Sequence, residues 1–77
     1  MPTVFKQGKY RAFFYAQDCD EPVHVHVEHE ANRCKYWIDP LKMAKSGGFK
    51  AHELREIEKM LKENLEVITK KWADFCP

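Results

Sequence analysis

The chain has 77 residues, of which 44% are apolar, and a formal net charge of +1. This length predicts one domain over residues 1–77, with a core small enough that a second copy of the chain is a plausible partner. The near-neutral charge argues against a general nucleic-acid binder, and no apolar run approaches the roughly 20 residues of a membrane span.

The N-terminal third of the chain is expected to begin a sheet. Residues 4–6 are a candidate short strand, and residues 9–16 are a second strand, rich in aromatic side chains. Apolar residues fall on both faces of that second strand, which is typical of a strand covered on both sides. An acidic loop at residues 17–21 follows, and Pro22 restricts Glu21 to an extended conformation.

Residues 23–29 carry the most informative pattern of the chain. Valines alternate with His24 and His26, which is the period of a half-buried strand. The valines therefore share one face, which is expected to meet the core. His24, His26 and Glu28 share the other face, which is expected to display the two imidazoles at the surface. His29 falls on the valine face and is a poorer candidate for a joint site.

The sheet is expected to continue and then give way to a helix. A turn at residues 30–32, with Asn32 in a left-handed conformation, leads to a strand at residues 33–38. A short edge strand at residues 41–44 precedes the Gly-rich turn. From residue 51 the apolar period changes from 2 to 3.6, which predicts an amphipathic helix of about 25 residues with a kink near residues 63–64.

The start of this helix is only partly signalled. Lys50 is expected at the N-cap, although lysine is a poor cap, and Glu53 at the third helical position completes part of a capping box. The fold class is therefore α+β: three to four antiparallel strands covered on one face by one long C-terminal amphipathic helix.

The three cysteines, Cys19, Cys34 and Cys76, are odd in number and form no CxxC pair. This usage predicts reduced thiols in a cytoplasmic protein rather than a disulfide framework, with Cys34 as a small core residue. The first residues also lack the charged and apolar regions of a secretory signal.

Short motifs along nearly the whole chain resemble one family of small bacterial proteins, the domain of unknown function 4160. The motifs are Met1-Pro2-Thr3, Phe13-Phe14-Tyr15, Asp18, the run from Glu21-Pro22 to His26-Val27, Tyr36-Trp37-Ile38, Gly48-Phe49, Glu53-Leu54, Glu63-Asn64 and Trp72. The Pro-x-His-x-His segment, here Pro22, His24 and His26, is the most specific of them.

This resemblance implies a small bacterial cytosolic domain encoded beside a second small protein, in an arrangement similar to toxin–antitoxin pairs. It transfers no catalytic residue. Lys50 departs from the usual Ser or Thr cap, and Cys19-Asp20 fill the loop before Glu21. Neither departure removes the histidines.

The histidine pair allows a metal site. Alternate strand residues point the same way about 6.6 Å apart, so His24 and His26 can converge on one divalent transition metal such as zinc. The carboxylates that could complete the site are Asp18, Asp20, Glu21 and Glu28. The alternative is that both histidines face solvent or hydrogen-bond the sheet surface.

A second hypothesis is acid–base chemistry without a metal. His24 and His26 would act as base and acid of a small ribonuclease, with a cation such as Arg11, Arg33 or Lys35 steadying the phosphate. The catalytic candidates are then His24, His26 and Arg11.

A third hypothesis involves binding alone. Tyr10, Tyr15, Tyr36 and Trp37 could form an aromatic surface for a partner chain or single-stranded nucleic acid, although aromatic residues in so small a domain are usually core. The preferred function is a component of a toxin–antitoxin-like two-gene module that acts through protein association, with the neighbouring-gene product or a second copy as partner. A metal- or histidine-dependent ribonuclease and a purely structural domain are the alternatives.

Overall fold

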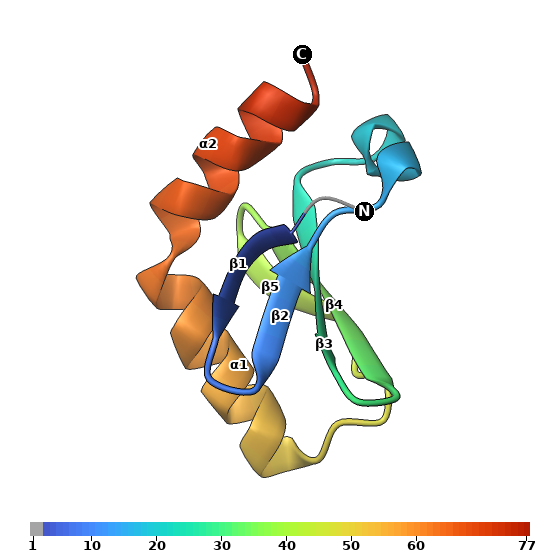
Figure 1. Ribbon diagram of the computed structural model, residues 1–77, viewed down its shortest axis with the longest axis vertical. Helices are drawn as coiled ribbons and strands as arrows, with labels where there is room; N and C mark the ends of the chain where they lie inside the picture. The colour runs from blue at the N-terminus through green and yellow to red at the C-terminus, as the bar shows by residue number, and fades with distance from the viewer. Residues whose placement is uncertain (1–2) are drawn as a thin grey trace.

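The computed structural model describes residues 3–77, and Met1 and Pro2 lie outside the described residues. The elements in order are β1 (Thr3–Gln7), β2 (Tyr10–Phe13), the 3₁₀ helix η1 (Ala16–Asp20), β3 (His24–His29), β4 (Asn32–Ile38), β5 (Leu41–Lys45), α1 (Ala51–Glu63) and α2 (Leu65–Phe75). The strands form one antiparallel sheet in the order β1-β2-β3-β4-β5. The two helices lie across one face of this sheet (Figure 1).

The α+β class is therefore confirmed, but the expected three to four strands are five and the expected single helix is two. Most side chains of β5 are exposed, so its hydrophobic period is weak. Its place in the sheet depends on backbone pairing with β4, where Tyr36 lies opposite Met43 and Ile38 opposite Leu41.

The core lies between the sheet and the helices. Val25 and Val27 are fully buried there, so the predicted valine face is confirmed. The buried residues of the helices are Ile57, Met60, Leu61 and Ile68, all members of the predicted apolar stripe.

Two tyrosines of the aromatic-surface hypothesis also belong to this core. The hydroxyl groups of Tyr10 and Tyr36 donate to the carboxylates of Glu56 and Glu58 on α1, at 2.7 and 2.9 Å. Burial raises the pKa of both hydroxyls above their ordinary value of 10.0. Neither ring is therefore available for stacking on a ligand.

The helix boundaries agree with the sequence analysis. Lys50 is the N-cap of α1, and its backbone N–H donates to the Glu53 carboxylate at 3.0 Å. The predicted kink is a break at Asn64, whose φ of −124° and ψ of 18° are not helical. The amide of Asn64 donates to the backbone carbonyl of Met60 at 2.8 Å, which satisfies an acceptor left free by the break.

Two turns differ from expectation in detail. Glu30, with a φ of 55°, holds the left-handed position that Asn32 was expected to take. β2 ends at Phe13 rather than at residue 16, because Ala16 begins η1.

After β5, Gly47 has a φ of 62° and approaches β4 so closely that a Cβ atom would lie 1.5 Å from the carbonyl oxygen of Arg33. This position therefore requires glycine.

The prediction of reduced thiols is wrong for two of the three cysteines. A disulfide joins Cys19 of η1 to Cys76, directly after α2, across 57 residues of sequence. Spacing alone did not reveal this pair, because only the packing of α2 along the sheet brings the C-terminal end of the chain to η1. Cys34 is free and buried, as expected. Within residues 3–77, no helix is long and apolar enough to cross a membrane.

Candidate metal centre

Asp18, in η1, is the first of the three residues of the candidate metal centre, which also contains His24 and His26. Its Oδ2 atom accepts the backbone N–H of Tyr15 at 2.7 Å, and its own carbonyl accepts the N–H of Glu21 at 3.1 Å. These bonds turn the carboxylate back toward the first residues of β3. Asp18 is consequently only 8% exposed, although the sequence placed it in an acidic loop.

His24 is fully buried, so the expectation that it is displayed at the surface is wrong. Its ring packs against Trp37 of β4 and Trp72 of α2, with centroid distances of 5.4 and 5.3 Å. Its Nδ1 atom lies 2.8 Å from the carbonyl oxygen of Pro22. The alternating pattern gave the correct face of the strand but could not show that other segments cover the start of that face.

His26 lies on the same face of β3 and is half-buried. Its ring stacks on Phe13 of β2 at a centroid distance of 5.5 Å and meets the edge of Tyr15 at 4.6 Å. These contacts hold the imidazole in one orientation while leaving one side toward solvent.

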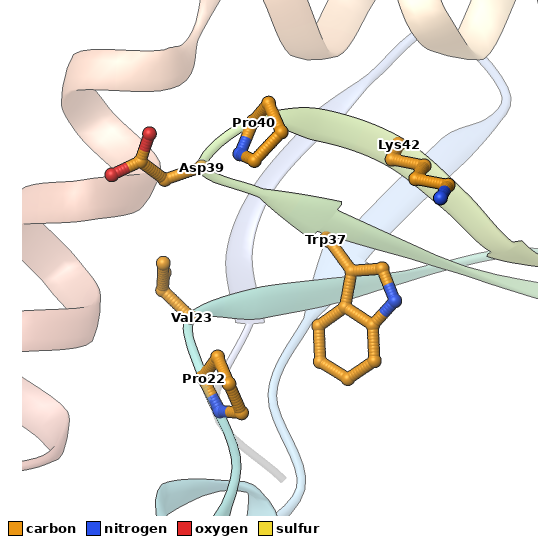
Figure 2. Close-up of a pocket in the computed structure, with 6 residues that line it drawn as sticks. All are labelled: Pro22, Val23, Trp37, Asp39, Pro40 and Lys42. Carbon is orange, nitrogen blue, oxygen red and sulfur yellow. The ribbon is translucent and has the colours of Figure 1, made fainter.

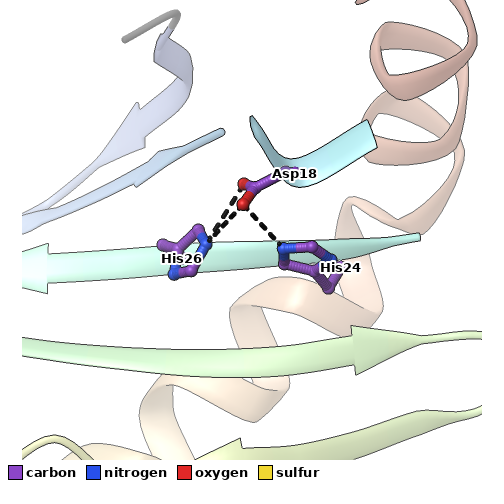
Figure 3. A group of neighbouring side chains, drawn as sticks. All are labelled: Asp18, His24 and His26. Atoms are coloured by element: carbon purple, nitrogen blue, oxygen red, sulfur yellow. Dashed lines mark hydrogen bonds and ion pairs between the residues drawn. The ribbon is translucent and has the colours of Figure 1, made fainter. Parts of the chain in front are cut away.

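The carboxylate of Asp18 lies between the two imidazoles, as Figure 3 shows. The Nε2 atom of His24 is 3.0 Å from Oδ1 of Asp18. The Nε2 atom of His26 is 3.1 Å from Oδ2 and 3.3 Å from Oδ1. One potential ligand atom from each of the three residues therefore meets in a cluster no more than 4.8 Å across.

Electrostatics favour the metal-binding protonation states of two members of this cluster, Asp18 and His26. Burial alone would raise the pKa of Asp18, but the hydrogen bond from the Tyr15 N–H and the interactions with both histidines lower it below its ordinary value of 3.8. Burial lowers the pKa of His26, although Asp18 opposes the change. Near neutral pH the cluster thus contains an ionised carboxylate and a neutral His26, and both are metal ligands in these forms.

The structure does not bring Glu21 into this cluster. Its Oε1 atom is 4.0 Å from Nδ1 of His24, the ring nitrogen that does not face Asp18. The same oxygen accepts a hydrogen bond from Lys35 at 2.6 Å, and this bond lowers the pKa of Glu21.

Arg11 makes contacts with residues other than the two histidines. Its Nη1 atom lies 3.0 Å from Oε1 of Glu28, and its Nε atom donates to the hydroxyl of Thr3 at 2.9 Å. Its guanidinium group covers the ring of Phe13 at 4.7 Å. Arg11 therefore contacts residues of β1, β2 and β3: Thr3, Phe13 and Glu28.

A hollow of about 320 Å³ opens beside Asp18 and His26. It is lined by Tyr15, Asp18, Glu21, His26, Arg33, Cys34, Lys35 and Lys45. The sequence analysis proposed Arg33 and Lys35 as cations near the histidines, but it missed Lys45. Only the pairing of β5 with β4, which places Lys45 opposite Lys35, could have revealed it.

Comparison with known proteins gives a family. Neither the curated proteins nor the solved structures contain a match to this chain. The model of the family described as "Domain of unknown function (DUF4160)" matches residues 10–73, which include β2 to β5, most of both helices and all three residues of the cluster. The chain therefore belongs to the DUF4160 family.

Proposed function

We propose that Asp18, His24 and His26 bind a divalent transition metal ion, zinc in the first instance, and that this centre is the functional site. The observation that carries the proposal is how the two ring nitrogens of the buried His24 are hydrogen-bonded. The Pro22 carbonyl can only accept a hydrogen bond, so Nδ1 of His24 carries a proton. In a neutral imidazole the other nitrogen, Nε2, then carries a lone pair.

That lone pair has no suitable partner among residues 3–77. Nε2 of His24 is buried and makes no well-aligned hydrogen bond, yet it lies 3.0 Å from a carboxylate oxygen of Asp18. With a neutral His24 protonated on Nδ1, two electron-rich atoms at this distance would repel each other in a buried environment. A cation bound to both removes the repulsion. A second proton on His24 would also do so, and this is the histidine-dependent alternative.

The distances suit a metal ion. Tetrahedral zinc with bonds of about 2.0–2.2 Å places neighbouring ligand atoms roughly 3.3 Å apart. Oδ1 of Asp18 lies 3.0 Å from Nε2 of His24 and 3.3 Å from Nε2 of His26, and the three ligand atoms lie within 4.8 Å of one another. The Pro22 carbonyl on His24 and the Tyr15 N–H on Asp18 are the outer hydrogen bonds that orient metal ligands in proteins. Three protein ligands leave a fourth position for water, as in catalytic zinc sites.

Zinc titration of chelator-treated protein tests this proposal. We expect one zinc ion per chain, by elemental analysis after gel filtration. Asp18→Asn keeps the size of the side chain but removes its charge, and should weaken zinc affinity at least about tenfold. Zinc at one hundred times its Kd should stabilise the wild-type fold by about 2.7 kcal/mol.

His29→Gln is the matched control, because His29 lies on the same strand with its side chain on the opposite face. This variant should bind zinc as the wild type does, and circular dichroism verifies that both variants are folded. Failure of the wild type to retain zinc, or equal affinity in Asp18→Asn, would refute the metal centre. In that case the acid–base hypothesis would account for the cluster.

We also propose that the protein associates with a second chain, as a component of a toxin–antitoxin-like two-gene module. The supporting observation is an apolar pocket of about 230 Å³ at the end of the sheet where β3 begins and β4 turns into β5 (Figure 2). It is lined by Pro22, Val23, Trp37, Asp39, Pro40 and Lys42. Aromatic and proline side chains framed by charges are common at protein interfaces.

Co-expression with the neighbouring-gene product tests this association. We expect a complex that survives gel filtration and is lost in Lys42→Glu, which reverses a charge at the pocket. Val67→Ala, on an exposed position of α2, should leave the complex intact. A single chain that elutes as a monomer with and without its neighbour would contradict the proposal and favour a purely structural domain.

A cytoplasmic location stays a prediction as well. Because cytosolic reductants keep most thiols free, the Cys19–Cys76 disulfide would then have to form in a reducing compartment. Rapid alkylation of thiols in freshly lysed cells, followed by mass spectrometry, measures whether Cys19 and Cys76 are joined by a disulfide inside the cell.

A further inference from the structure

The hollow beside the centre is lined on one side by cations from two adjacent strands. Arg33 and Lys35 alternate along β4 and therefore point to the same face of the sheet. Lys45 lies opposite Lys35 on β5. All three side chains line the hollow together with Asp18 and His26.

The placement of Lys45 opposite Lys35 brings two like charges together, which a bound anion would offset. Like charges directly opposite each other on neighbouring strands destabilise a sheet. Lys35 is compensated by Glu21, at 2.6 Å, and by the ring of Trp37, at 4.4 Å. Lys45 is exposed and makes no ion pair within residues 3–77. The formal charge of the hollow is three cations against Asp18 and Glu21, or +1, and a divalent metal would raise it to +3.

Arg33 lines the hollow and keeps N–H donors that its contacts within the protein do not use. Its Nη1 atom donates to the hydroxyl of Tyr15 at 2.7 Å, which fixes the guanidinium group at the wall of the hollow. Its contact with Glu28 is longer, 3.5 Å, and about half of its side chain is exposed. A guanidinium group presents several N–H donors in a plane, so donors remain for a second acceptor.

We propose that this hollow binds the phosphate group of a phosphodiester and that the adjacent metal centre hydrolyses it. The inference rests on the proposed metal centre. One phosphate oxygen would approach the open side of the centre, while Arg33 and Lys45 hold the remaining charge. Charge-assisted hydrogen bonds of this kind are the usual means of binding phosphate.

The reaction that this arrangement supports is hydrolysis. The oxygen of one water molecule forms a bond to phosphorus, the bond from phosphorus to one ester oxygen breaks, and that oxygen leaves as an alcohol after taking a proton from the water. The products are a phosphomonoester and an alcohol, with no oxidant or further reactant. A divalent metal ion held by Asp18, His24 and His26 would lower the pKa of a bound water molecule, which would then be the nucleophile.

The rim of the hollow leaves room for both ester groups of a diester. The side chains of Arg33 and Glu21 are about half exposed, and Lys45 is exposed as well, so the hollow opens to solvent along the sheet. Both ester groups of a phosphodiester can therefore leave the hollow without crossing the core. Nucleic-acid strands and small diesters share this chemistry.

Cleavage assays on zinc-loaded protein test the inference with two probes, bis(p-nitrophenyl) phosphate and a fluorescent single-stranded RNA. We expect cleavage of at least one probe, with RNA cleavage identifying a nucleic-acid source. Lys45→Ala should raise KM roughly tenfold, the value of one lost charge-assisted hydrogen bond, without changing zinc stoichiometry. Lys70→Ala is the matched control, because Lys70 is an exposed lysine of α2 and lies outside the hollow.

The two proposals can fail separately. Protein that retains zinc but cleaves neither probe overturns the phosphodiester inference alone. Equal effects of Lys45→Ala and Lys70→Ala also overturn it, because general surface charge would then explain binding. Loss of zinc binding in the wild type is the failure of the metal centre, and elemental analysis detects it independently of any cleavage.

Discussion

The ionised carboxylate of Glu53 contributes to the stability of the fold, and this contribution depends on pH. It accepts the backbone N–H of Lys50 at the start of α1 and lies 3.5 Å from Nζ of Lys9. The hydrogen bond from Lys50 and the charges of Lys9 and His52 lower its pKa below the ordinary value of 4.5, against the opposing effect of burial. A group whose pKa is lowered by folding stabilises the fold above its unfolded pKa, and this stabilisation is lost as the pH falls through the folded pKa.

Glu53→Gln should therefore melt at a lower temperature than the wild type near about pH 7, and the difference should shrink below about pH 4.5 as the wild-type carboxylate becomes neutral. Thermal melts followed by circular dichroism measure the difference. Glu63→Gln, at the other end of α1, controls for the loss of one acidic side chain. A gap that stays constant down to about pH 3 would show that the charge of Glu53 plays no part.

At the scale of elements, η1 is the segment on which the centre depends. It contains Asp18 and the next residue, Cys19, which forms a disulfide with Cys76 just beyond α2. The disulfide thus ties the short helix to the end of the chain, on the side where Trp72 covers His24. A 3₁₀ helix of five residues has little stability by itself, so this link fixes the position of the carboxylate.

Removing the link should lower the free energy of unfolding by about 2–4 kcal/mol, because a long loop of the unfolded chain is released. Urea unfolding of Cys19→Ser/Cys76→Ser against the oxidised wild type measures this effect. Reductant should destabilise the wild type and leave the double variant unchanged. Alkylation of the unfolded, unreduced wild type should label only Cys34, whereas three labelled thiols would contradict the disulfide.

Cys34 itself should resist alkylation in the folded protein. It is 1% exposed, and burial raises the pKa of its thiol to about 12. The reactive thiolate is therefore scarce as well as inaccessible. Any labelling of folded, reduced protein is consequently expected at Cys19 and Cys76, which makes the thiol count a measure of the disulfide alone.

At the scale of the whole molecule, one layer of helices covers one face of the sheet and leaves the other face for chemistry (Figure 1). The helix-covered face holds Val25, Val27 and the two buried tyrosines. The opposite face holds His26, Arg33 and Lys35, which belong to the centre and its hollow. Cover from η1 and from Trp72 of α2 buries His24 completely, whereas 14% of the His26 side chain stays exposed.

Local periodicity determined much of this arrangement in advance. Alternation placed Val25 and Val27 in the core and set His24 and His26 on the other face, because strand side chains must alternate. The apolar period of 3.6 predicted the buried stripe of the helices, and the kink expected near residues 63–64 is the break at Asn64. The metal hypothesis also named Asp18 with the two histidines, since an acidic loop leads directly into β3.

Only tertiary structure decided how the two faces are used. Contacts between segments far apart in sequence buried His24 beneath Trp72, excluded Glu21 and Arg11 from the cluster, paired Cys19 with Cys76 and set Lys45 across from Lys35. Periodicity reports the direction of a side chain relative to its own strand or helix. Burial, ion pairing and the distances between ligand atoms depend on side chains from distant parts of the sequence. The positions of those side chains are set only when the sheet and the helices pack together.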